Sequence, residues 1–239
     1  MIFSLTAHRV LDLLFPERCV LCGGYLSFRS RRGPFPVCGD CAGSFVPEAG
    51  PRCAVCSMPL ISEDRLCMRC RGRERRFADN HSLFLYSRPR VARALAAYKG
   101  EGATGLAIFF GDFLADHLRG LDPGLVLVPV PCRRESLTRR GFDQVLLLCR
   151  ALRRRHGFRY RRLLVRSGGG REQKTLNRTD RETNLRGAIQ PKKSIRGGVP
   201  KRVVLLDDVF TTGATADACA GVLTAMGVER VSVLTIAID

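Results

Sequence analysis

The sequence predicts an α/β domain, with a parallel sheet flanked by helices, that follows a small N-terminal zinc-ribbon domain. Four Cys-x2-Cys pairs lie before residue 71, in a stretch that is rich in Gly and Pro and lacks long apolar runs. From about residue 82, continuously apolar runs alternate with helix-like patterns, which is typical of strands buried in a parallel sheet. We therefore expect one unit at residues 1–80 and a second at residues 81–239.

The first stretch of the chain, residues 2–15, has apolar side chains at the spacing of a short amphipathic helix. His8, Arg9 and Asp12 interrupt it and no small-residue cleavage site follows, so it does not resemble a secretory signal. No run approaches the ~18 uninterrupted apolar residues that a membrane span requires. With 45% hydrophobic residues among 239, the chain can form one or two cores, and we expect a cytoplasmic protein without a membrane span.

The cysteine pairs indicate two structural zinc ions. Each Cys-x2-Cys turn presents two thiolates to one tetrahedral ion, so four turns complete two four-sulfur sites. The alternatives are an iron–sulfur cluster or redox-active thiols, although no pair lies at a strand-to-helix junction that would lower a thiol pKa. The spacing leaves the pairing open between sequential ribbons and an interleaved finger, and sequential pairing closes the shorter loops. The eight expected ligands are Cys19, Cys22, Cys38, Cys41, Cys53, Cys56, Cys67 and Cys70.

The second unit reads as a succession of short strands and helices. Strand-like and helix-like runs follow one another at 83–86, 91–98, 105–118, 125–130, 145–155, 203–206, 215–226 and 231–238. Between residues 157 and 203 there are many charges and little apolar periodicity, which predicts a long loop or flap over the edge of the sheet.

The most informative segment covers residues 201–215, where a buried strand ends in two carboxylates, Asp207 and Asp208. A short turn of hydroxyl residues with Gly213 leads into the helix expected at 215–226. Backbone N–H groups at a helix N-terminus can surround a phosphate together with hydroxyls, and glycine lets the backbone approach it. Carboxylates just before the turn can accept hydrogen bonds from two vicinal hydroxyls. These features predict a phosphorylated sugar as ligand, since the segment is neither a Walker loop nor a dinucleotide fingerprint.

Residues 203–215 resemble the motif with which type I phosphoribosyltransferases bind phosphoribosyl pyrophosphate (PRPP). The wider chain resembles the ComF family, in Val-Pro-Val-Pro-Cys-Arg-Arg at 128–134 and in Arg-Arg-Gly-Phe-Asp-Gln at 139–144. The four cysteine pairs resemble the double zinc ribbon that opens such proteins. Asp143 and Ile189 depart from the family pattern, in which Asn and Phe are commoner. Further matches are Tyr98-Lys99-Gly100, Arg171, Gln173, Leu176, Arg178, Arg181, Asn184 and Gly187-Ala188.

The resemblance implies a type I phosphoribosyltransferase fold and a role for each matched residue. Asp207 and Asp208 would hold the ribose hydroxyls at the catalytic centre, while Arg133 and Arg134 would bind pyrophosphate oxygens. Mg²⁺ would bridge pyrophosphate and ribose oxygens. Displacement of pyrophosphate from C1 would pass through an oxocarbenium-like state that carboxylates and cations stabilise. The residues implied around the phosphate are Val209, Thr211, Thr212, Gly213, Ala214 and Thr215.

Three functions stay open at this point. The chain is an active phosphoribosyltransferase with an unknown acceptor, or a non-catalytic factor that binds single-stranded nucleic acid or DNA-processing proteins in DNA uptake, or a sensor that only binds PRPP. Charge bears on this choice. Of the net charge of +18, residues 133–202 carry +17, from 22 Lys and Arg against 5 Asp and Glu. We expect this excess at the rim of the PRPP site, where a longer polyanion could bind.

Overall fold

The structure is a computed structural model, which describes residues 17–26, 35–61, 65–121, 124–167, 187–195 and 197–239. The helix expected at 2–15 lies outside the described residues, as do the family-like positions between 171 and 184. Among the described residues, no helix is long and apolar enough to cross a membrane.

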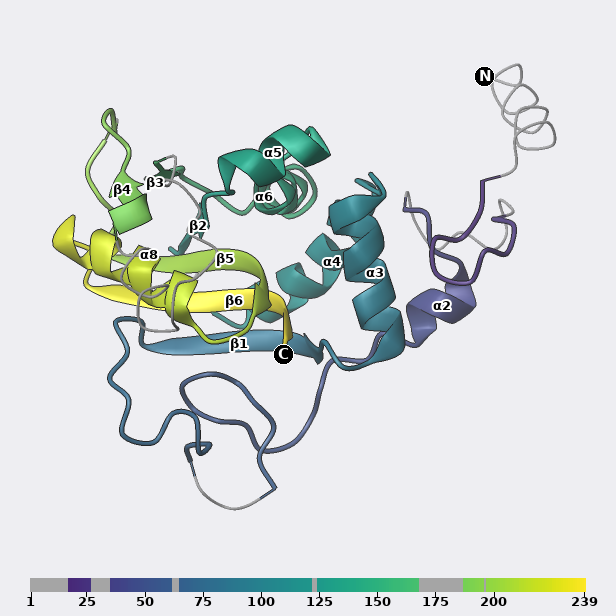
Figure 1. The fold of residues 1–239 in the computed structure, drawn as a ribbon, viewed down its shortest axis with the longest axis horizontal. Coiled ribbons are helices and arrows are strands. Elements are labelled where there is room, and N and C mark those ends of the chain that lie inside the picture. Colours follow the sequence, from purple (N-terminus) through teal and green to yellow (C-terminus); the bar gives the residue numbers. More distant parts are fainter. Residues whose placement is uncertain (1–16, 27–34, 62–64, 122–123, 168–186, 196) are drawn as a thin grey trace, which may run out of the picture.

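A four-stranded parallel sheet forms the centre of the molecule (Figure 1). In spatial order its strands are β1 (Asp79–Leu85), β6 (Arg230–Ile238), β5 (Arg202–Phe210) and β2 (Val126–Pro129). A separate antiparallel pair contains β3 (Leu164–Arg166) and β4 (Ile189–Pro191). The continuously apolar runs of β5 and β6 are buried on both faces, as parallel strands covered by helices require. The predicted α/β class is confirmed.

Helices cover both faces of this sheet. One face is covered by α3 (Pro89–Gly100), α4 (Leu106–Arg119) and α6 (Gln144–His156), and the other by α8 (Ala214–Ala225). Successive side chains of a strand point to opposite faces. In β5, Val204 and Leu206 therefore join the core formed with α3, α4 and α6, while Val203 and Leu205 join the core formed with α8.

One further helix, α5 (Arg134–Arg140), has no counterpart in the apolar pattern of the sequence. None of its residues is buried, so it carries no apolar stripe that could reveal it. The next helix, α6, is capped by Asp143, whose Oδ1 accepts a hydrogen bond from the backbone N–H of Leu146 at 2.9 Å. The aspartate that departs from the family pattern thus keeps an oxygen that caps this helix.

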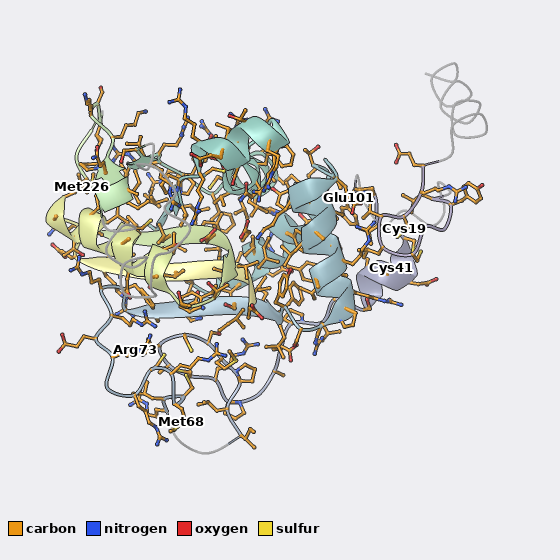
Figure 2. The ribbon with its side chains drawn as sticks, viewed as in Figure 1. Cys19, Cys41, Met68, Arg73, Glu101 and Met226 are labelled. Carbon is orange, nitrogen blue, oxygen red and sulfur yellow. The ribbon has the colours of Figure 1, made fainter. Side chains whose placement is uncertain are left out.

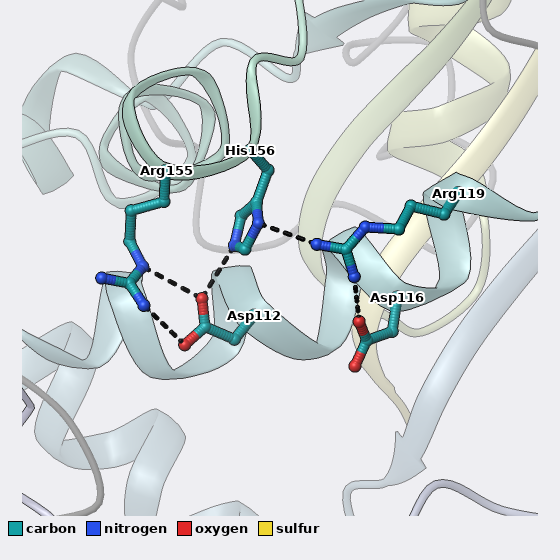
Figure 3. Close-up of polar contacts among 5 residues, drawn as sticks. All are labelled: Asp112, Asp116, Arg119, Arg155 and His156. Atoms are coloured by element: carbon teal, nitrogen blue, oxygen red, sulfur yellow. Dashed lines mark hydrogen bonds and ion pairs between the residues drawn. The ribbon is translucent and has the colours of Figure 1, made fainter.

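Polar side chains join α4 to the end of α6 (Figure 3). Arg155 donates to both carboxylate oxygens of Asp112, from Nε at 3.1 Å and from Nη2 at 3.4 Å. Nε2 of His156 lies 2.8 Å from Oδ1 of Asp112, and Nδ1 lies 3.0 Å from Nη2 of Arg119. Because a guanidinium can only donate, Nδ1 accepts and Nε2 carries the proton. Arg119 also pairs with Asp116, so one network fixes α4 against α6.

The cysteine-rich segments dock at two different places on the α/β domain (Figures 1 and 2). The first, which contains α2 (Gly39–Gly43), packs Phe35 and Phe45 against Phe109 of α4, with ring centroids 5.1 and 4.9 Å apart. The second lies along β1, where the backbone N–H of Asn80 donates to the carbonyl of Val55 at 2.8 Å. Each segment shares an apolar core with the sheet and its helices. The domain boundary near residue 80 stays a prediction.

Candidate functional site

The two acidic residues lie near the carboxyl end of β5. The strand runs on to Phe210, two residues past the carboxylates in which the sequence predicted that it ends. It is longer because β6 continues beside it and pairs Thr235 with Asp207. On the other side β2 stops at Pro129, which pairs with Leu206. The acids therefore lie just where β5 has lost one of its two neighbours, at an open edge of the sheet.

Asp208 is 6% exposed and has two charged or polar partners. Its Oδ1 lies 2.8 Å from Nζ of Lys99, and its Oδ2 accepts a hydrogen bond from Nε2 of Gln144 at 2.9 Å. Lys99 lies in the last turn of α3 and Gln144 begins α6, so two helices of one face supply these partners. The hydroxyl of Tyr98 donates to the carbonyl of Gln144 at 2.6 Å. Lys99 offsets the cost of burying the carboxylate, and the two contacts fix its orientation.

Asp207 is more exposed than Asp208 and is held locally. Its Oδ1 accepts a hydrogen bond from the backbone N–H of Asp208 at 2.8 Å. Burial raises the pKa of Asp207 well above its usual range, and the charge of Asp208 raises it further. The charges of Lys99 and Arg166 act on the pKa in the opposite direction. A cation that binds beside Asp207 would therefore favour its charged form.

The loop after β5 packs its backbone closely against the side chains of Phe210 and Arg75. Gly213 has φ +80°, and a Cβ there would lie 2.8 Å from Cζ of Phe210 and 3.1 Å from Nη1 of Arg75. The hydroxyl of Thr212 accepts from the backbone N–H of Ala214 at 3.3 Å. Helix α8 begins at Ala214, one residue before the predicted start. Its N-cap is Gly213, which has no side chain that could cap an N–H of the first turn. Such a helix start can offer N–H groups of its first turn to an anion.

Most of the predicted phosphate residues converge on one small cavity of about 30 Å³. The cavity joins a carboxylate, three threonines and the start of α8, which is the combination expected around part of a phosphorylated sugar. The predicted residues in its lining are Asp207, Val209, Thr211, Gly213 and Thr215. Thr212 and Ala214 lie in the same turn, outside this lining.

Arg133 and Arg134 follow β2 at the same end of the sheet. Arg133 precedes α5 and Arg134 begins it; both are exposed, and neither lines the small cavity. Arg166 of β3 is more buried, and its pKa is lowered by burial first and then by the charge of Arg133. Because the charge of Arg166 also lowers the pKa of Asp207, these cations and the acids share one electrostatic environment.

The sequence pattern does not single out four residues that surround this site. Lys99 and Gln144 fall within segments that resemble the ComF family, and that overlap is the signal that could identify them. Arg166 lies in a strand of three residues, too short to show a period. Arg75 follows the last cysteine pair, and nothing around it in the sequence indicates a contact with a loop more than a hundred residues away.

The cysteine pairs assemble sequentially, which decides the alternative that their spacing leaves open. In each cluster the four sulfur atoms lie within 4.8 Å of one another, with 3.8 Å between Cys22 and Cys38 and 3.5 Å between Cys56 and Cys67. Thiolates at ~2.3 Å from a tetrahedral zinc ion lie about 3.8 Å apart, so both clusters are consistent with structural zinc. The first cluster contains Cys19, Cys22, Cys38 and Cys41, and the second contains Cys53, Cys56, Cys67 and Cys70.

A larger groove, of about 800 Å³, lies at the opposite end of the sheet. Its lining residues precede β2 and β5 or lie around the end of α6. Because the amino ends of parallel strands lie at one edge of a sheet, the groove is at the edge opposite to the acidic residues. Part of the cation excess of residues 133–202 is therefore far from the acidic site, whereas the sequence predicted it at the rim of that site. The groove's cationic and aromatic residues are Arg153, Arg159, Arg161, Lys201, Arg202, Phe158 and Tyr160.

Comparison with known proteins gives matches over most of the chain. Residues 10–71 match the double zinc ribbon domain family. The competence protein ComFC of Streptococcus pneumoniae is 28% identical over 231 residues, which cover 92% of this chain and 99% of that protein. The DNA utilization protein YhgH of Escherichia coli K12 is 26% identical over 227 residues, which cover 92% of this chain and 96% of that protein.

Two solved structures overlap with part of the chain. Glutamine PRPP amidotransferase of B. subtilis has 21% identity and a TM-score of 0.39, over 56% of this chain and 26% of that one. Hypoxanthine phosphoribosyl transferase of Trypanosoma cruzi has 17% identity and a TM-score of 0.36, over 59% of this chain and 67% of that one. These overlaps are too low to carry an argument about activity, which rests on the residues of the loop and its surroundings.

Proposed function

Because this chain belongs to the ComFC/YhgH family, in which a double zinc ribbon precedes a phosphoribosyltransferase-like fold, we propose that residues 207–215 bind PRPP together with Mg²⁺. The observation that carries the proposal is the arrangement of residues 207–215, in which Asp207, the threonines and Gly213, with φ +80°, lie together at the start of α8. The relatives are named for competence and for DNA utilization. We therefore place the PRPP chemistry of this chain in the uptake or use of DNA.

Each part of PRPP has a chemical counterpart at this end of the sheet. Its 5′-phosphate suits the hydroxyls of the loop and the N–H groups of the first turn of α8. The ribose hydroxyls can donate to Asp207 and Asp208. The pyrophosphate would then face Arg133 and Arg166, whose guanidinium groups can bind phosphate oxygens.

Mg²⁺ prefers oxygen ligands, and the site offers a carboxylate and neighbouring hydroxyls. Asp208 already pairs with Lys99 and Gln144, so Asp207 is the residue that we expect to hold the ion, directly or through water. When bound, the ion would neutralise charge on the pyrophosphate and make it a better leaving group.

The activity that we propose is transfer of the phosphoribosyl group. The bond from C1 to the pyrophosphate oxygen breaks, its electron pair leaves with pyrophosphate, and a bond from C1 to the acceptor forms. Positive charge would develop on the ribose in the transition state, and the carboxylate of Asp207, which lines the cavity, would stabilise it, whereas Asp208 is already paired with Lys99. A sensor needs only the binding step, so turnover separates the two functions.

Isothermal titration calorimetry with PRPP and Mg²⁺ tests the binding step. We expect the Asp207→Asn variant to bind at least tenfold more weakly, and Asp116→Asn, which changes an exposed acid on α4, to bind like the wild type. Equal affinity of the wild type and Asp207→Asn would refute the site. Pyrophosphate release with a series of candidate bases then decides turnover: release above the Asp207→Asn background supports a transferase, and binding without release supports a sensor.

A second candidate function, binding of single-stranded nucleic acid, rests on the basic groove at the opposite end of the sheet. Cations and aromatic rings together bind such strands, because the cations neutralise phosphates while bases stack on the rings. Five cations and the rings of Phe158 and Tyr160 line the groove. Arg161 is fixed in the wall, where its Nη2 donates to the carbonyl of Gly197 at 2.9 Å. Since the PRPP loop lies at the other edge, both ligands could be held at once.

Fluorescence anisotropy with a labelled single-stranded oligonucleotide tests this second function. We expect Arg159→Glu to weaken binding several-fold and Arg90→Glu, an equal charge change on α3 outside the groove, to have little effect. The logarithm of the binding constant should fall steeply with the logarithm of salt concentration. A flat salt dependence, or the same loss in both variants, would contradict a role for the groove.

A further inference from the structure

The segment that follows the second cysteine cluster reaches across to the start of α8. Nη1 of Arg75 lies 2.6 Å from Oδ2 of Asp217, and its Nη2 donates to the carbonyl of Thr212 at 2.9 Å. The Arg75 side chain is only 10% exposed. A single guanidinium thus contacts both the loop of residues 211–213, the phosphate loop, and the first turn of α8. Figure 2 shows Arg73 of the same segment in the space between the second cluster and the sheet.

The surface of α8 is shaped to receive this segment. A Cβ on Gly213 would lie 3.1 Å from Nη1 of Arg75, and a Cβ on Gly221 would overlap Nη1 of Arg76. The backbone N–H of Arg76 donates to Oδ1 of Asp217 at 3.0 Å, so the segment binds both carboxylate oxygens of Asp217. Both glycines therefore leave open the space that the guanidinium groups of Arg75 and Arg76 occupy.

The second cluster anchors the segment on one side and the sheet on the other. The backbone N–H of Arg73 donates to the carbonyl of Cys70 at 3.2 Å, which ties the segment to a cluster cysteine. Asn80 of β1 donates from Nδ2 to the carbonyl of Cys56 at 2.8 Å and to Oγ of Ser82 at 2.9 Å. Oγ of Ser82 lies 2.6 Å from the hydroxyl of Thr235, the residue that pairs with Asp207 in the sheet. The first cluster packs against α4 instead, away from the loop.

We infer that Arg75 is a positioning residue for the phosphate loop, and that the second cysteine cluster, rather than the first, sets the conformation of the loop through it. The ligand consequences rest on the proposed binding of PRPP, while the effect on the loop itself does not. Arginine suits the role because its planar fork reaches the carboxylate of Asp217 and the carbonyl of Thr212 from two different nitrogens, whereas lysine would have to reach both from one nitrogen.

Hydrogen exchange of the protein without ligand tests the positioning directly. The reporter is the amide of Asp217, which donates to the carbonyl of Gly213 at 2.8 Å and so closes the first turn of α8. We expect Arg75→Ala to speed exchange of this amide at least tenfold, and Arg75→Lys to have a smaller effect. The matched control is Arg88→Ala, because Arg88 also pairs with a carboxylate, of Glu48 at 2.6 Å, and donates to a carbonyl. Exchange at Asp217 within twofold of the wild type in Arg75→Ala would overturn the inference.

A second arm covers the case in which Arg75→Ala fails to fold. Asp217→Asn keeps Arg75 and weakens its ion pair, so it should speed exchange in the same turn, and unchanged exchange in this variant would overturn the inference. If Arg75→Ala folds, the two substitutions together should add less than their sum. Fully additive effects on the exchange rate would overturn the inference that the contact between Arg75 and Asp217 holds this turn.

Cysteine variants test the difference between the clusters. Cys56→Ser should speed exchange at Asp217, whereas Cys22→Ser in the first cluster should not, with zinc content measured on both. Equal effects of the two variants would overturn the assignment to the second cluster.

Calorimetry with PRPP and Mg²⁺ then measures the consequence for the ligand, which we expect to bind about tenfold more weakly to Arg75→Ala than to the wild type. If the wild type itself does not bind PRPP, the proposed function fails, and the exchange at Asp217 still decides the role of Arg75. If the wild type binds and Arg75→Ala binds equally well, the positioning role is refuted while the proposed function stands.

Discussion

Replacement of Gly213 by alanine is the sharpest test of the loop geometry. The backbone there has φ +80° and ψ 0°, and the added Cβ would come within 2.8 Å of Cζ of Phe210 and 3.1 Å of Nη1 of Arg75. Two costs follow. The left-handed conformation costs alanine ~1 kcal/mol, and displacement of the packed ring adds ~1–3 kcal/mol. The ring resists displacement because it packs edge-on against Phe77, with centroids 5.9 Å apart.

A matched control separates these two costs. Gly157, at the end of α6, has φ 77° and ψ 2°, and nothing lies within 4 Å of a Cβ built there. Gly157→Ala should therefore lower the free energy of unfolding by ~1 kcal/mol, and Gly213→Ala by about 2–4 kcal/mol. The difference between the two variants is the steric cost at the loop.

Urea denaturation measures the free energy of unfolding, and calorimetry measures the affinity for PRPP with Mg²⁺. We expect Gly213→Ala to bind PRPP at least tenfold more weakly, since the loop backbone and Arg75 must both move, and Gly157→Ala to bind like the wild type. If the two alanine variants were equally stable and bound PRPP equally well, the packing of the loop as described would be wrong.

Three further predictions concern the surroundings of the site. Lys99→Met should destabilise the protein by ~3 kcal/mol in urea denaturation, because it leaves Asp208 buried without its cation, and a loss below 1 kcal/mol would contradict the pairing. Burial alone would raise the pKa of Asp79, but the hydrogen bond from His81 and other partners lower it to about 2, below the ~3.9 of an unfolded chain. The stabilisation that this carboxylate provides is therefore complete above about pH 4 and is lost as pH falls toward 2. The difference in unfolding free energy between the wild type and Asp79→Asn should shrink over that range, and a constant difference would contradict the lowered pKa. Elemental analysis should find two zinc ions per chain and one after a cysteine of either cluster is replaced by serine, while iron or an unchanged zinc content would contradict the assignment.

The local features of the site could be predicted from sequence, and the long-range ones could not. Asp207, Asp208 and the hydroxyl turn are contiguous, so residue types and spacing suffice to predict a phosphate loop there. The partners of Asp208 come from two separate helices, and only the packing of those helices on the sheet brings Lys99 and Gln144 together. The extension of β5 past the acids also depends on a neighbour, because β6 continues beside it.

The distribution of charge shows how strand direction decides where residues lie. Residues that follow a parallel strand gather at one edge of the sheet, and residues that precede a strand gather at the other. Arg133 follows β2 and lies near Arg166, whereas Lys201 and Arg202, at the beginning of β5, line the basic groove at the opposite edge. The net charge of residues 133–202 sums the charges at both edges of the sheet. It therefore predicts a basic patch at the acidic site, where only part of that charge lies.

The docking of the cysteine clusters had no counterpart in the sequence pattern. Spacing indicates that the cysteines form two four-sulfur sites, and the structure shows that they pair sequentially. The faces on which the clusters dock depend on side chains such as Phe45 and Arg75, whose partners lie far along the chain.

Whether residues 207–215 hold PRPP can be seen in a crystal structure of the protein with PRPP and Mg²⁺. We expect the 5′-phosphate against the turn from Thr211 to Thr215 and the ribose hydroxyls on Asp207 and Asp208. PRPP bound elsewhere, or this loop empty at saturating PRPP, would contradict the proposal.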